Sequence, residues 1–221
     1  MEKDVESRAA RIDRFVKRWV GHPGFWLLWV ALIFSWPITR AVRANLPDAL
    51  PHLGQVAHFS LTNQYGANFD SQEQLAGKIW VANFIFTRCP TVCPAFTKKM
   101  FEVQHRVRHL HQAVQLVSFS VDPDYDTPER LLDYAQEHRA SPFIWSFLTG
   151  PLDEVKNTVS ESLKISMGGQ RPDGNFEGIF HGSHFVLIDG GMQIRGFYNA
   201  EDEGSMDELL SDMSWVVNRG G

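Results

Sequence analysis

The sequence predicts an α/β domain, a mixed sheet with helices on both faces, preceded by an N-terminal transmembrane helix. Residues 80–86 (WVANFIF) and 114–121 (VQLVSFSV) are nearly continuous apolar runs, which are typical of buried strands. Segments with helical features follow both runs, and strands that alternate with helices favour a mixed sheet. A stretch without charge near the N-terminus supplies the transmembrane helix.

The first half of the domain shows these elements in order. Residues 56–61 alternate weakly and lead into turn-forming residues 63–66, which indicates a hairpin. After the first buried strand, residues 94–110 place apolar side chains at helical spacing. After the second, Thr127 before Pro128 forms a good helix start, and we expect this helix to end near residue 139.

The second half is predicted in the same way. We expect a short strand at residues 143–148 and a helix at 152–163. Residues 168–178 hold four glycines and a proline and predict a loop. The apolar segments 184–189 and 192–198 flank two glycines, which is a hairpin signal, and a final helix is expected at residues 206–217.

The composition is that of a globular protein. Of the 221 residues, 43% are hydrophobic and 21% are charged, which excludes a disordered or collagen-like chain. Two cysteines are too few for a disulfide-stapled scaffold or for a zinc or iron–sulfur site with four thiolates.

Charge is unevenly distributed along the chain. Residues 1–45 carry eight Lys and Arg against four Asp and Glu, whereas residues 46–221 carry thirteen against twenty-two. The net charges are therefore +4 and −9. An acidic main domain lacks the clustered cations that neutralise phosphates, so we expect no nucleic-acid partner.

The basic end surrounds a candidate membrane anchor. No charged residue lies between Arg18 and Arg40, and a membrane-spanning helix needs about 20 residues. Four tryptophans in this gap suit the membrane interface. We therefore expect residues 20–39 to cross a membrane. The alternatives are a buried core helix and a cleavable signal, since residues 42–44 loosely resemble a cleavage site.

The flanks of the anchor predict its orientation and the division of the chain. Lys and Arg are in excess before the gap, and positive charge favours the cytoplasmic side. We expect a single span of the inner membrane, with residues 1–19 as a cytoplasmic amphipathic segment and the C-terminal domain in the periplasm. Residues 40–55 contain two prolines and are interpreted as a linker, which leaves residues 56–221 as the domain.

Both cysteines lie in one segment, Cys89-Pro-Thr-Val-Cys93-Pro94, between a predicted strand and a predicted helix. Pro94 suits the first helical turn, so Cys93 is expected at the helix N-terminus. The helix dipole there favours a thiolate, and Arg88 adds positive charge nearby. The two sulfurs are expected to converge, either to close a disulfide or to share a metal ion. The alternative to a disulfide or a metal site is that both cysteines are inert buried thiols.

A metal bound by two thiolates takes a further ligand, and copper(I) is the natural candidate because soft thiolates select it. His105 and His109 are four residues apart on the predicted helix, although charged neighbours indicate a solvated face. His181 and His184 lie where the glycine-rich loop enters a strand. Without further information, a loop histidine has no assigned role.

These motifs resemble the Sco/SenC family of copper-binding, thioredoxin-like proteins. The family signature is Cys-x-x-x-Cys-Pro after a strand, with a distant His before a strand of the form apolar-Leu-Ile-Asp. The chain has Cys89, Cys93 and Pro94, then the segments SVDP (120–123) and DTPE (126–129), then His181 ahead of VLID (186–189). The matches keep the family order across about residues 56–218, and a membrane anchor is also usual in the family.

The resemblance implies a thioredoxin-like fold and one copper ion bound by Cys89, Cys93 and His181. Alignment of the Leu-Ile-Asp strand places the ligand at His181 and leaves His184 at a variable position. Asp122 resembles a structural residue beside the site and is not expected to be a ligand. The implied role is the delivery of copper to the dinuclear copper site of cytochrome c oxidase, whose copper-site subunit is then the partner.

Three functions follow from these residues. A metallochaperone, which is not an enzyme, binds copper and hands it over. A membrane-tethered thiol–disulfide oxidoreductase would use Cys89 and Cys93 as a redox-active disulfide, although three residues rather than two separate them. A peroxide-reducing enzyme is indicated only by a faint likeness of residues 89–91 to peroxiredoxins. We favour the chaperone, with the reductase second; the sequence predicts no oligomeric state.

Overall fold

The structure is a computed structural model that describes residues 20–44, 49–89, 92–110, 113–167 and 183–219. The chain divides into two compact units, Met1–Ala49 and Leu50–Gly221. The predicted amphipathic segment 1–19 and the predicted loop 168–178 lie outside the described residues.

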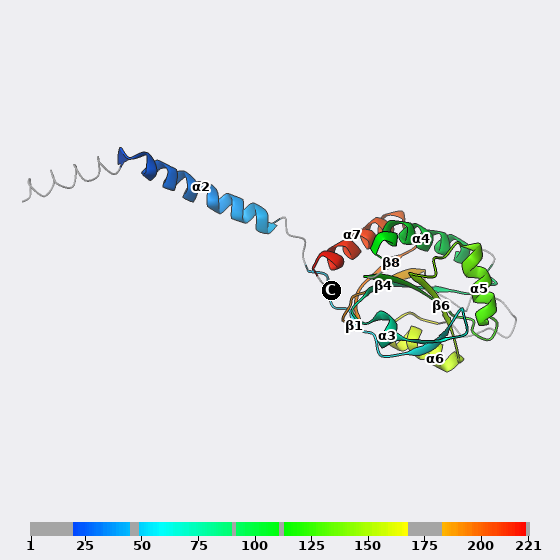
Figure 1. Ribbon diagram of the computed structural model, residues 1–221. Helices are drawn as coiled ribbons and strands as arrows, with labels where there is room; N and C mark the ends of the chain where they lie inside the picture. Colours follow the sequence, from blue (N-terminus) through cyan, green and yellow to red (C-terminus); the bar gives the residue numbers. More distant parts are fainter. Residues whose placement is uncertain (1–19, 45–48, 90–91, 111–112, 168–182, 220–221) are drawn as a thin grey trace, which may run out of the picture. The chain divides into compact units, whose positions relative to one another are not determined.

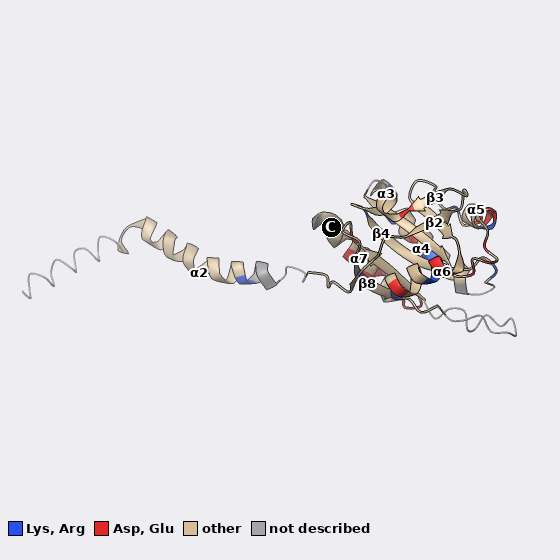
Figure 2. Ribbon diagram, turned by 90° about the horizontal axis from the view of Figure 1, so that it is seen from below, with Lys and Arg blue, Asp and Glu red and all other residues tan. Residues whose placement is uncertain are grey.

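The first unit contains one described helix, α2 (Pro23–Ala44). Its apolar side chains are exposed, with Leu27 at 71% and Trp36 at 66%. Arg40 is the one charged residue among those side chains of α2 that the structure describes, as Figure 2 shows. A search of the described helices by length and apolar character finds none that could cross a bilayer. The transmembrane helix expected at residues 20–39 is therefore not confirmed.

The second unit is built on one mixed sheet (Figure 1). Its described strands are β1 (Gly54–Gln55), β2 (Ser60–Asn63), β3 (Asn68–Asp70), β4 (Ile79–Ile85), β5 (Val114–Ser120), β6 (Trp145–Thr149), β7 (His184–Ile188) and β8 (Gln193–Asn199). They lie in the order β1-β8-β7-β4-β5-β6-β2-β3. The pairs β4–β5 and β5–β6 are parallel and the remaining pairs are antiparallel, so the predicted mixed sheet is confirmed.

Helices cover both faces of this sheet, as predicted. They are α3 (Ser71–Leu75), α4 (Val92–Val107) with a 3₁₀ turn η1 (Arg108–Leu110), α5 (Pro128–Glu137), α6 (Leu152–Lys156) with a π-helical turn η2 (Asn157–Ser162), and α7 (Glu203–Arg219). In Figure 1, α4 and α7 lie above the sheet and α3 and α6 below it. Thr127 caps α5 by accepting the backbone N–H of Arg130, as its place before Pro128 predicts.

Strand β4 separates two apolar cores because its side chains alternate between the faces. Trp80 and Phe84 join a core with side chains of α3, α6 and η2, and this core also contains both cysteines. Val81 and Ile85 join the other core, with side chains of α4, α5 and α7. All seven residues of β4 are buried, which explains the continuous apolar run in the sequence.

The structure extends the domain into the predicted linker. The compact unit begins at Leu50, which packs against the core, and β1 pairs with β8 through Gly54 and Ile194. The hairpin strand expected at residues 56–61 is instead Ser60–Asn63. The helix expected at 152–163 begins at Leu152 and passes into a π-helical turn, where the Thr158 hydroxyl donates to the Glu154 carbonyl oxygen at 2.8 Å.

Candidate metal centre

The two cysteines meet at the junction between β4 and α4. The turn after β4 places Cys89, whose backbone N–H donates to the Phe86 carbonyl oxygen at 3.1 Å. Cys93 is the second residue of α4, as predicted, and its backbone N–H donates to Cys89 Sγ at 3.5 Å. Both side chains are buried, with exposed fractions of 7% and 1%, and the two cysteines are in the reduced form. The expected convergence of the two residues is therefore confirmed.

The expected effect of the helix N-terminus on Cys93 is wrong. Burial raises the pKa of the Cys93 thiol well above its ordinary value, and the neighbouring Cys89 and the charge of Asp126 act in the same direction. A backbone hydrogen bond from Phe86 lowers the pKa but does not compensate. The dipole of α4 is outweighed because the sulfur is removed from water. Cys93 is therefore held as a thiol that must lose its proton before it binds a metal.

The histidines on the helix do not belong to this site. His105 and His109 are exposed near the far end of α4 from Cys93, and His105 Nε2 lies 3.3 Å from Arg108 Nη1. The prediction of a solvated face is confirmed for these two residues. In the described part of the chain, no three His, Cys, Asp or Glu side chains come together as a metal site, so His184 does not join the cysteines.

His181 lies outside the described residues, so the structure does not test its role as a ligand. The strand that follows it is described. Strand β7 runs antiparallel to β4, with Val186 opposite Ala82 and Ile188 opposite Trp80. This register directs the first residue of β7, His184, toward the carboxyl end of β4. The start of β7 therefore lies at the same edge of the sheet as the end of β4, which leads into Cys89.

Arg88 and Asp122 form an ion pair beside the cysteines. Arg88 Nε donates to Asp122 Oδ2 at 2.5 Å, and the Asp122 side chain is 6% exposed. The guanidinium carbon of Arg88 also lies 4.7 Å from the centre of the Tyr125 ring. The prediction that Asp122 has a structural role agrees with this contact.

The structure also identifies Asp126, for which no role was predicted from the sequence. Its side chain is fully buried, and it accepts from the Thr87 backbone N–H at 3.1 Å, the Thr87 hydroxyl at 2.5 Å and the Ser120 hydroxyl at 2.6 Å. Burial raises the pKa of Asp126, while the hydrogen bonds from Ser120 and Thr87 lower it. The sequence offers one signal for a role of Asp126, the spacing Asp122-x-x-x-Asp126. This segment follows the second buried strand, which is next along the chain after the strand that leads into the cysteines.

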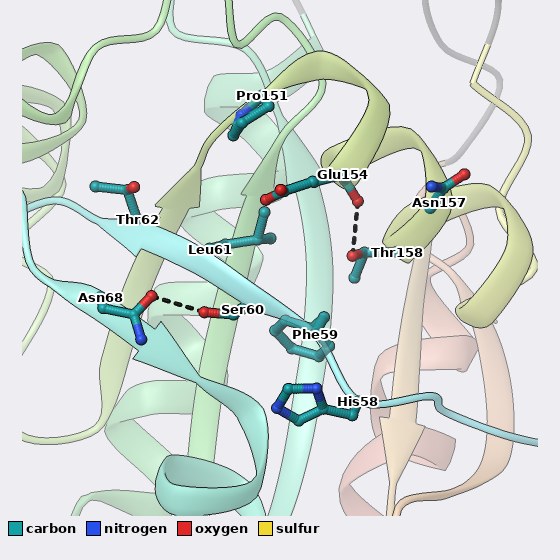
Figure 3. A pocket seen from close by; sticks show the side chains of 10 residues that line it. All are labelled: His58, Phe59, Ser60, Leu61, Thr62, Asn68, Pro151, Glu154, Asn157 and Thr158. Carbon is teal, nitrogen blue, oxygen red and sulfur yellow. Dashed lines mark hydrogen bonds between the residues drawn. The ribbon is translucent and has the colours of Figure 1, made fainter.

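A separate hollow of about 430 Å³ lies between β2, β3 and the α6–η2 segment (Figure 3). Polar side chains line much of it, and Figure 3 shows the Ser60 hydroxyl bonded to Asn68 and the Thr158 hydroxyl bonded to Glu154. Neither Cys89 nor Cys93 is among the described residues that line it. The Ser60 and Thr158 hydroxyls therefore already have partners within the chain.

Comparison with known proteins gives one consistent family. The SCO1/SenC family model matches residues 49–218. The SCO1 protein homolog of Bacillus subtilis is 34% identical over 160 residues, which cover 72% of this chain and 81% of that protein.

Solved structures agree with this match. BsSco, described as a member of the Sco family of cytochrome c oxidase assembly proteins with a disulfide switch, is 32% identical, with a TM-score of 0.66 over 76% of this chain and 96% of that chain. Bradyrhizobium japonicum ScoI with copper bound is 23% identical, with a TM-score of 0.61 over 74% of this chain and 99% of that chain, and shows the shared fold.

Proposed function

The chain belongs to the SCO1/SenC family of thioredoxin-like proteins, and we propose that it is a copper metallochaperone. It binds one copper ion through Cys89, Cys93 and His181 and assists assembly of the dinuclear copper site of cytochrome c oxidase. The observation that carries the proposal is the convergence of two buried thiols at one strand-to-helix junction. Soft thiolates select copper(I) over harder divalent ions, so this donor set suits copper.

The residues of the chain perform two tasks in this function. The turn at Cys89 and the start of α4 hold the two thiols together before the ion arrives. The apolar core around them excludes water, which raises the pKa of the Cys93 thiol and protects the bound ion from hard ligands. Handover requires a partner with at least two thiols, because an incoming thiolate must replace each leaving sulfur. Copper is cargo in this scheme, so no substrate is turned over.

The third ligand is the first point to test. We expect His181→Ala to weaken copper(I) binding and to change the absorption spectrum of the copper complex, because a two-thiolate site loses its imidazole. His184→Ala is the matched control and is expected to leave the spectrum nearly unchanged, since His184 does not meet the cysteines. Both variants are compared by copper titration, with thiol counts for Cys89 and Cys93. The opposite pattern would make His184 the ligand.

A thiol–disulfide reductase acting on the same target is the second candidate. The contact between the Cys93 N–H and Cys89 Sγ favours it, because it places the two cysteines side by side, and neighbouring cysteines can interconvert with a disulfide. In this reaction one thiolate attacks the target disulfide, the second thiol resolves the mixed disulfide, and the target leaves as a dithiol. A copper site built from cysteines must be reduced before it is loaded, so the two functions are compatible.

We also propose that the N-terminal unit tethers the protein to the inner membrane and places the domain in the periplasm. Support comes from the charge-free gap and from the exposed apolar side chains of α2. The full-length chain is expected in the membrane fraction, and a reporter fused after Gly221 is expected to be active only outside the cytoplasm. Leu28→Arg combined with Ile33→Arg should release the protein, since each central arginine costs about 3 kcal/mol of insertion. Recovery of the wild-type chain as a soluble cytosolic protein would contradict the proposal.

A further inference from the structure

The turn that carries Cys89 is held by the loop that follows β5. The two residues directly before Cys89 each bond to a different aspartate of this loop: Thr87 to Asp126 and Arg88 to Asp122. The loop is itself ordered, because the backbone N–H of Asp126 donates to the Asp122 carbonyl oxygen at 2.9 Å. Two segments that are about 35 residues apart in the sequence are therefore joined immediately beside the cysteines.

The two aspartates differ in their surroundings. Arg88 is 31% exposed, so water and salt screen its pairing with Asp122. Asp126 is fully buried, and each group that the structure shows bonded to its carboxyl group can act as a donor. A carboxylate, which only accepts, matches these donors, whereas an amide would place an NH₂ group against at least one of them. In a buried site a mismatched donor is costly, so Asp126 is the stronger link.

We propose that Asp126 is a positioning residue that holds the Cys89 turn against α4 and so keeps the two thiols at reacting distance. This inference deepens the proposed function, because the same distance serves both the chelation of copper and the closure of a disulfide. Asp126 acts through Thr87 and the turn, because its carboxyl group accepts both the backbone N–H and the hydroxyl of Thr87. Ser120 completes the link: its hydroxyl donates to Asp126 and accepts the backbone N–H of Asp122 at 3.2 Å.

The experiment measures the equilibrium between the Cys89–Cys93 dithiol and its disulfide in dithiothreitol redox buffers, using the full-length protein. A looser turn lowers the effective concentration of one thiol at the other. We expect Asp126→Asn to lower the equilibrium constant for disulfide formation about tenfold, which raises the reduction potential by about 30 mV. The affinity for copper(I) is expected to fall in the same variant. Thr87→Val and Ser120→Ala, which remove one hydroxyl each and keep the carboxylate, should give smaller shifts in the same direction.

Asp189 provides the matched control. It is also a buried carboxylate with three donors, from the backbones of Gly191 and Gln193 and from Arg195, but it follows the end of β7 that pairs with the start of β4. Asp189→Asn is therefore expected to lower the melting temperature without moving the potential. If Asp126→Asn does not fold, the Thr87→Val and Ser120→Ala potentials decide the outcome.

Two results would overturn the proposal. One is an unchanged potential in the Thr87→Val and Ser120→Ala variants, which keep the carboxylate and remove only a hydrogen bond to it; this result would show that Asp126 does not act through its bonds to the turn. The other is an equal shift in Asp126→Asn and Asp189→Asn, which would show a general loss of stability. The redox equilibrium involves no metal, so failure of the copper function would leave this test intact, and failure of this test would leave copper binding to be measured separately.

Discussion

Replacement of Cys93 by Ser is expected to abolish tight copper(I) binding. A hydroxyl is a hard, neutral ligand, whereas copper(I) selects thiolates, and the chain has two cysteines in all. The variant would keep Cys89 and His181, and one thiolate with one imidazole binds copper(I) far less tightly than two thiolates do. Copper is measured per chain after anaerobic titration with a competing copper(I) chelator, and the expected stoichiometry falls from one to near zero.

Two controls accompany this variant. Cys89→Ser is expected to give the same loss, because both sulfurs serve one ion. Circular dichroism of each variant should match the parent, since Ser is close in size to Cys and each replacement is at a single buried position. A Cys93→Ser protein that still holds one copper ion with unchanged affinity would place the site elsewhere in the chain.

Replacement of Asp189 by Ala is expected to cause the largest loss of stability among the variants considered. The Asp189 carboxylate is 2% exposed and pairs with Arg195 Nε at 2.6 Å. Arg195 is 13% exposed, so removal of its partner leaves a buried charge uncompensated, which costs about 3–5 kcal/mol. Removal also frees the N–H groups of Gly191 and Gln193, which shape the hairpin between β7 and β8.

The loss is measured as the free energy of unfolding in urea. The matched control is Asp207→Ala on α7, an exposed position at which the change is expected to stay within about 0.5 kcal/mol. An Asp189→Ala loss that is as small as the control would show that the Arg195 pair and the hairpin contribute little to folding.

Much of the fold could be predicted from the sequence because the central strands are buried on both faces. Strand β4 is a nearly continuous apolar run, and its predicted position differs by one residue at each end from Ile79–Ile85. The capped helix α5 begins where Thr127 and Pro128 indicate. These signals depend on residues that are neighbours in the sequence, so they can be recognised without knowledge of the tertiary contacts.

The short edge elements could not be predicted. Strand β1 has two residues, Gly54 and Gln55, which show no alternation and become a strand only by pairing with β8. Helix α3 has five residues, and the Asp70 side chain caps it by accepting the backbone N–H groups of Gln72 and Glu73. Such elements are too short to show a hydrophobic periodicity in the sequence, so their formation depends on tertiary contacts.

The site was predicted in part. The position of Cys93 at the start of α4 follows from the neighbouring proline and the preceding strand, which are local features. Its raised pKa depends on burial by residues distant in the sequence, and the dipole argument alone gives the wrong sign. The role of Asp126 depends on a contact across 39 residues with Thr87, which no spacing rule reveals.

The central claim is that the reduced cysteine pair is the copper site. The most direct test is an anaerobic copper(I) titration of the full-length protein in two forms, the Cys89–Cys93 dithiol and the Cys89–Cys93 disulfide. The account predicts one tightly bound copper ion per chain in the dithiol form and none in the disulfide form, because the disulfide has no thiolate to donate. A disulfide form that binds copper as tightly as the dithiol form would contradict it.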